Sequence, residues 1–164
     1  MAAYTLWGVA PVYFVLVGFA VPLEILAQRI VWSIPLLVLF ITIAKQWRAL
    51  VSLDRVSLGW LALCAMLLSI NWLTFIHGIS VGRIAETSLG YFINPLVTIA
   101  LGYFFLAERL RPIQWIAVAL AALGVLLELL VAGKLPWIAV TLALSFGFYG
   151  LVRKRVNVPS VRLR

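Results

Sequence analysis

A single arginine lies inside an apolar stretch, where a fixed positive charge could bind a ligand. Arg29 follows Pro22, the first residue of that stretch, by about seven residues, which is roughly 10 Å of helix. If the stretch crosses a membrane, an arginine at this depth costs a few kcal/mol unless it is paired or hydrated. The functional interpretation is that Arg29 lines a cavity and attracts an anionic or zwitterionic substrate. The structural alternatives are snorkelling to the interface or pairing with Glu24 or Glu86.

Two carboxylates near the starts of apolar stretches could carry protons. Glu24 and Glu86 occupy such positions, and proton coupling requires a carboxylate that changes its protonation during the cycle. The alternative for Glu86 is helix capping, because a negative charge in the first turn interacts favourably with the helix dipole, by about 0.3–1 kcal/mol. The sequence favours capping for Glu86 and leaves proton coupling open for both residues.

Polar and aromatic side chains recur at helical spacing in the central apolar run. Thr87, Tyr91, Asn94 and Thr98 fall on one helical face. Asn71, in the preceding run, could hydrogen-bond Asn94 across two helices, or both amides could line a cavity with Tyr91 and Trp72. Further candidates for an aromatic wall of that cavity are Trp7, Tyr13 and Tyr149.

The elements that carry these residues are apolar segments of membrane-spanning length. Of 164 residues, 65% are hydrophobic and only 11% are charged, whereas a soluble domain is about half apolar and a quarter charged. A span needs about 20 apolar residues, and no stretch alternates at period 2 as a barrel would. We predict an all-α multipass membrane protein in contact with the lipid bilayer. Its six apolar segments cover roughly residues 2–19, 22–44, 56–80, 87–107, 112–131 and 135–152.

Charge placement predicts orientation and excludes other function classes. Ten of the 13 lysine and arginine residues follow the second, fourth and sixth segments, which predicts that both termini are cytoplasmic. The net charge of +8 therefore reflects topology and not nucleic-acid binding. His77 has no partner at metal spacing, and no nucleophile triad or phosphate loop occurs, so we expect no metal, no cofactor and no enzymatic activity.

A weak internal repeat suggests how the chain is organised. Tyr149-Gly150 in the sixth segment falls where Trp7-Gly8 falls in the first. Because five helices is an odd number, a second copy beginning at the sixth helix would enter the membrane in the opposite orientation. We predict a five-helix repeat at 1–131. Residues 132–164 would then hold the sixth helix and a basic tail, the start of an incomplete second repeat.

Several motifs resemble those of a known family. They are WGVAPVYF (7–14), E-x-L-x-x-R-x-x-W-S (24–33), NWLTFI (71–76), ETSLGYFINPLVTIALGYFFLAERL (86–110), QWIAVALAALGV (114–125) and FYGLVRK (148–154). With these motifs the chain resembles the EamA branch of the drug/metabolite transporters, specifically the bacterial RarD type. It departs from the family pattern at Gln28, where a histidine is common, and at Val15, where a basic residue is frequent.

The resemblance implies a secondary transporter of two inverted five-helix repeats, which exports small metabolites or drugs through a central cavity. This chain holds six of the ten helices so implied, and we expect a truncated form. Its missing half would come from a second membrane subunit or from a homodimer, although the charge bias disfavours an antiparallel pair. The alternative function is a non-transporting remnant or a scaffold subunit that needs a partner half.

Overall fold

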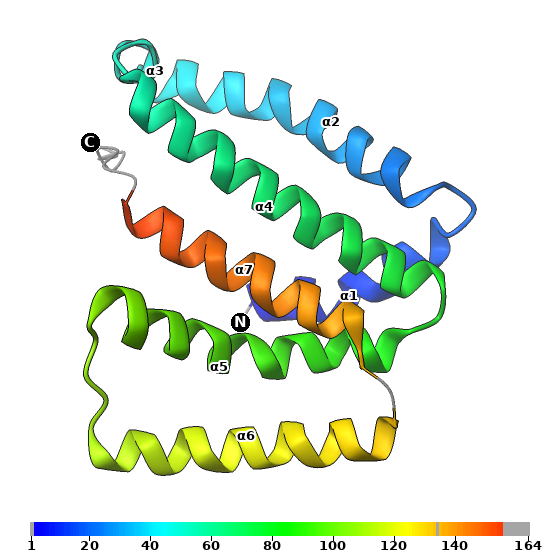
Figure 1. Ribbon diagram of the computed structural model, residues 1–164. Helices are drawn as coiled ribbons and strands as arrows, with labels where there is room; N and C mark the ends of the chain where they lie inside the picture. Colours follow the sequence, from blue (N-terminus) through cyan, green and yellow to red (C-terminus); the bar gives the residue numbers. More distant parts are fainter. Residues whose placement is uncertain (1, 134, 156–164) are drawn as a thin grey trace.

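The structure, a computed structural model, describes residues 2–133 and 135–155 and is built from helices within those ranges (Figure 1). Seven helices are found there, and six of them correspond to the six apolar segments, so the all-helical prediction is confirmed. The helices are α1 (Ala2–Leu16), α2 (Pro22–Ile43), α3 (Trp47–Val51), α4 (Arg55–Ser80), α5 (Ile84–Leu106), α6 (Pro112–Ala132) and α7 (Trp137–Arg155).

Local signals explain where the helices begin. Pro22 and Pro112 occupy the first turns of α2 and α6, where the missing amide hydrogen has no helical acceptor to lose. Asp54 caps α4, since its carboxylate accepts hydrogen bonds from the backbone amides of Val56 and Ser57 at 3.1 and 3.2 Å. The short helix α3 was not expected, because one and a half turns between charged residues leave no periodic pattern.

Helix α7 lies between α4 and α5 and packs more extensively against them than any other helix pair does (Figure 1). Glycines permit this close packing. A Cβ at Gly90 of α5 would come within 3.0 Å of Leu142, and one at Gly147 of α7 within 2.7 Å of Val97. On the outside, α2 packs against α4, and α6 packs against α5. The most extensively packed helix among the described residues is therefore α7, which follows the other six in the sequence.

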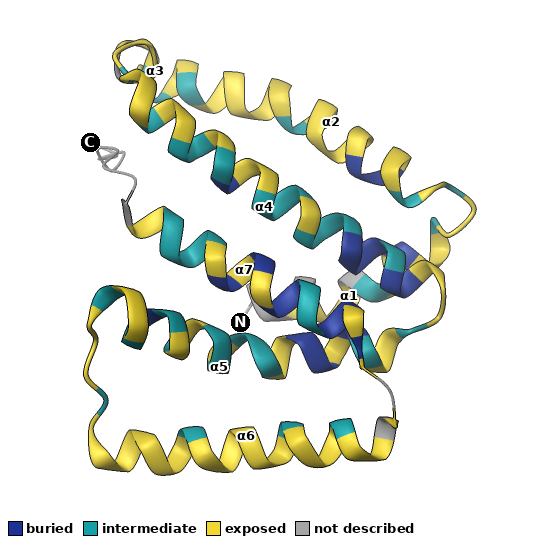
Figure 2. Ribbon diagram, viewed as in Figure 1, coloured by how far each residue is buried: buried dark blue, intermediate teal, exposed yellow. Residues whose placement is uncertain are grey.

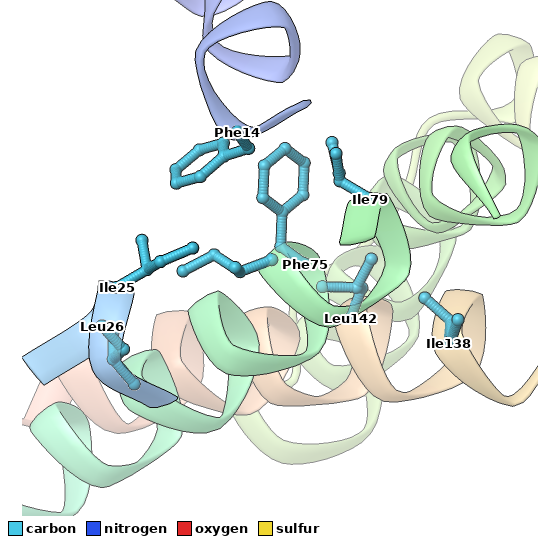
Figure 3. Close-up of a cluster of buried hydrophobic side chains, with 8 residues drawn as sticks. Phe14, Ile25, Leu26, Phe75, Ile79, Ile138 and Leu142 are labelled. Atoms are coloured by element: carbon cyan, nitrogen blue, oxygen red, sulfur yellow. The ribbon is translucent and has the colours of Figure 1, made fainter. Parts of the chain in front are cut away.

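The buried core lies at one end of the bundle, around the C-terminal half of α4 and the first turns of α7 (Figure 2). Figure 3 shows the cluster, to which α1, α2, α4 and α7 contribute. Its members are Phe14, Ile25, Leu26, Phe75, Ile76, Ile79, Ile138 and Leu142. This packing holds α1, which is only 15 residues long and ends at Leu16, three residues before the expected end, against α4.

Four helices, α2, α4, α5 and α6, are long and apolar enough to cross a membrane. Their outward faces carry large exposed apolar side chains, such as Leu36, Phe104 and Leu120. In water this surface would be very unfavourable, whereas in hydrocarbon it is the expected exterior of a helical bundle. The chain is therefore a multipass membrane protein whose outer helices contact lipid.

Candidate functional site

A cavity of about 760 Å³ lies between α1, α4, α5 and α7. Five aromatic residues line its wall: Trp72 and Phe75 from α4, Tyr91 from α5, and Phe146 and Tyr149 from α7. The amides of Asn71 and Asn94 and the hydroxyls of Thr87 and Ser88 supply its polar groups. This composition is typical of a small-molecule site, with an apolar wall and a few placed hydrogen-bonding groups.

The cavity brings together five of the residues selected from the sequence, namely Asn71, Trp72, Tyr91, Asn94 and Tyr149. Tyr13 is not part of the wall, and its ring packs edge-on against Phe14 at 5.2 Å. The side chain of Trp7 lies outside the described residues, although Gly8, its neighbour in α1, lines the cavity.

Arg29, an exposed residue of α2 that does not line the cavity, places its guanidinium over two aromatic rings. Its guanidinium carbon is 3.8 Å from the centre of the Trp72 ring and 5.4 Å from the centre of the Phe14 ring. Such cation–π contacts stabilise by about 0.5–2 kcal/mol, more where water is excluded. The ion pair with Glu24 or Glu86 that the sequence allowed is not formed. Arg29 is therefore held by aromatic rings and not by a carboxylate.

Glu86 joins two helices. Its carboxylate forms an ion pair with Arg83 and accepts a hydrogen bond of 2.9 Å from the amide of Ile138, in the first turn of α7. The residue thus caps a helix other than its own, and it lies where the dipoles of α5 and α7 both favour negative charge. Glu24, the other carboxylate considered for proton coupling, is exposed in the first turn of α2.

Asn71 binds a different helix from the one expected. Its side-chain nitrogen donates to the carbonyl of Leu142 and to the hydroxyl of Ser145, both at 2.9 Å. The Oδ1 atom of Asn94 instead accepts a bond of 3.3 Å from Thr98, one turn further along α5. Of the two alternatives that the sequence left open, the Asn71–Asn94 hydrogen bond is not formed, and both residues line the cavity. The reason is that α7 lies between α4 and α5 and supplies the nearer acceptors.

Sequence reasoning missed Phe75 and Phe146, which line the cavity. Phe75 links the aromatic residues of α4 and α5, because its ring packs edge-on against both Trp72 and Tyr91. The ring centroids are 5.7 Å and 6.1 Å apart, respectively. Nothing in the sequence distinguishes Phe75 from other apolar residues of α4. Phe146 could have been found, since it precedes Tyr149 by three residues and shares its helical face.

A second, smaller cavity of about 520 Å³ lies between α5 and α6. Its wall is apolar apart from Ser88 and Glu128, and Ser88 also lines the larger cavity. The described residues contain no cluster of three metal-ligating side chains. His77, which the sequence left without a function, packs its ring against Trp137 at 5.8 Å.

A bundle of long apolar helices with apolar outward faces belongs to the class of multipass helical membrane proteins. Within this class the chain belongs to the EamA-like transporter family, whose model matches residues 1–130. The family predicted from the sequence motifs is thus confirmed.

Curated relatives support the same family. An uncharacterized transporter of Vibrio cholerae is 49% identical over 98% of this chain and 54% of its own length. Protein RarD of Escherichia coli is 48% identical, over 98% and 55%. The "Chloramphenicol-sensitive protein RarD" of Pseudomonas aeruginosa is 34% identical, over 98% and 56%. The chain spans about half the length of these relatives, and no solved structure matches it.

Proposed function

We propose that this chain is part of a secondary transporter that exports small metabolites or drugs by alternating access. The observation that carries the proposal is the cavity of about 760 Å³. Its volume lies within the range of about 300–1,000 Å³ common for small-molecule sites, and its wall combines aromatic rings with two amides. The family of transporters to which the chain belongs supports the same function.

In this proposal the aromatic residues Trp72, Tyr91 and Tyr149 contact the substrate, and Asn94 orients it. Glu86 is the candidate for proton coupling, because its carboxylate connects α5 to the start of α7. Protonation would weaken that connection, since a neutral carboxyl group loses the ion pair with Arg83 and accepts more weakly. Both cavity-lining helices could then move relative to each other. Glu24 remains a second candidate.

We further propose that the protein resides in the bacterial inner membrane with both ends of the chain in the cytoplasm. The asymmetry of basic residues between successive gaps supports this orientation. Because the relatives are about twice as long, we propose that a second membrane unit of similar size, from another subunit or a second copy, completes the transport pathway.

Labelling of introduced cysteines with a membrane-impermeant maleimide tests the proposal without knowledge of the substrate. Cys64 is the single cysteine and is buried, so Cys64→Ala provides the background. Asn94→Cys and Tyr149→Cys report on the cavity from α5 and α7. Leu127→Cys, on an exposed apolar position of α6, is the lipid-facing control. Each variant is labelled in intact spheroplasts and in inside-out vesicles.

Alternating access predicts that both cavity positions react from both sides of the membrane, whereas the lipid-facing position reacts from neither. Labelling from only one side would support the alternative function, a scaffold subunit with a static cavity. If the cavity positions were as unreactive as the control from both sides, the cavity would not be a water-accessible pathway, and the transport proposal would fail.

A further inference from the structure

The wall of the larger cavity carries no acidic side chain. The chain has five acidic residues, Glu24, Asp54, Glu86, Glu108 and Glu128, and all five belong to the described residues. None of them lines the cavity. Glu86 comes nearest in sequence, next to Thr87, but its negative charge is balanced by Arg83 and by the Ile138 amide. A ligand in the cavity therefore meets no uncompensated negative charge.

A positive charge lies against one residue of the wall. Arg29 places its guanidinium 3.8 Å from the centre of the Trp72 ring, and Trp72 is a wall residue of the cavity. None of the five acidic side chains forms an ion pair with Arg29. An arginine that a membrane helix keeps without a carboxylate partner is costly, and such residues usually mark a ligand or ion pathway.

We propose that the cavity selects small organic anions with an aromatic or apolar body, of which aromatic carboxylates are the simplest. The rings of Phe75 and Tyr91 pack against the body of the anion. Arg29 provides the positive field beside Trp72, and it is a positioning residue because Trp72 lines the cavity and Arg29 does not. This inference rests on the proposed function, since it names the substrate class of the same cavity.

The expected selectivity follows from distance. An anionic group in contact with the cavity side of Trp72 would lie roughly 7 Å from the guanidinium carbon, the 3.8 Å to the ring centre plus about one van der Waals contact. At an effective dielectric constant between about 20 and 40, the attraction at that distance favours the anion over a neutral analogue by roughly sevenfold to fiftyfold. We expect about a tenfold preference.

Paired ligands measure this preference directly. Binding of benzoate, phenylacetate and naphthoate to the purified chain in detergent is compared with binding of the corresponding amides, which have nearly the same shape and no charge. The ratio of the two affinities is the readout, so a general loss of folding or of cavity shape cancels. Arg29→Gln removes the charge and Arg29→Lys retains it. Arg48→Gln, on the exposed helix α3, is the matched control.

The proposal predicts a ratio of about ten in the parent protein and in Arg48→Gln, a ratio near one in Arg29→Gln, and an intermediate or full ratio in Arg29→Lys. Equal binding of acid and amide in the parent, or an unchanged ratio in Arg29→Gln, would overturn it while leaving the cavity as a ligand site. Absence of binding by every acid would also overturn it. The cysteine labelling decides separately whether the cavity is a pathway, so the two proposals can fail independently.

Discussion

Replacing Asn71 with leucine should weaken the contact between α4 and α7, two of the helices that form the cavity wall. The change removes both hydrogen bonds from α4 to α7, those to the Leu142 carbonyl and the Ser145 hydroxyl. Both acceptor groups remain hydrogen-bonded without Asn71. The Leu142 carbonyl lies inside α7, and the Ser145 hydroxyl donates to the carbonyl of Thr141 at 2.6 Å. No buried acceptor is orphaned, so the cost is close to the net value of the two bonds.

Interhelical hydrogen bonds in membrane proteins average about 0.6 kcal/mol and reach about 1.7 kcal/mol. We therefore expect Asn71→Leu to lower the free energy of unfolding by about 1.2 kcal/mol, and by no more than about 3.4 kcal/mol. Reversible unfolding in mixed detergent micelles with increasing dodecyl sulfate measures this change. The signal is taken from a fluorophore pair on α4 and α7, so that it reports on the contact in question.

A double-mutant cycle assigns the effect to the bond itself. Ser145→Ala removes one of the two acceptors, and the coupling energy between the two substitutions should be about 0.6 kcal/mol. If the two changes were additive within error, or if Asn71→Leu were as stable as the parent, the amide would not hold α7 in place. The reasoning that assigns Asn71 to the α4–α7 interface would then be refuted.

Two further predictions concern single contacts outside this interface. An alanine Cβ at Gly78 would overlap the hydroxyl oxygen of buried Thr87, so Gly78→Ala should cost about 1–3 kcal/mol by the same unfolding assay, and Thr87→Ala in that background should recover part of it. The pKa of the Asp54 carboxyl lies below its usual value, chiefly because the Ser57 side chain donates a hydrogen bond to it and, to a smaller extent, because the Ser57 backbone amide does so. Stability from this cap is thus fully present above about pH 4 and is lost as the pH falls through the lowered pKa. The pH dependence of the melting temperature between about pH 2 and 5 should therefore flatten in Asp54→Asn, which caps the helix without titrating. An unchanged acid slope would contradict this account.

Much of the architecture could be predicted because the bilayer restricts the choices. Backbone groups in hydrocarbon must be bonded within the segment, so each apolar run has to be a helix, and the observed bounds differ from the predicted ones by only a few residues. The motifs were specific enough to identify the family. The cavity residues Tyr91 and Asn94 could also be selected, since their spacing places them on one helical face.

Only the tertiary structure decided which faces meet. Spacing along one helix defines a face but not its partner, and in lipid the apolar faces of all helices are nearly equivalent. Small contacts between residues far apart in sequence therefore select the arrangement. Because Gly90 and Gly147 let α7 approach α5, it is α7 that receives the amide of Asn71 and the carboxylate of Glu86. Arg29, left without that carboxylate, lies over the ring of Trp72, which lines the cavity.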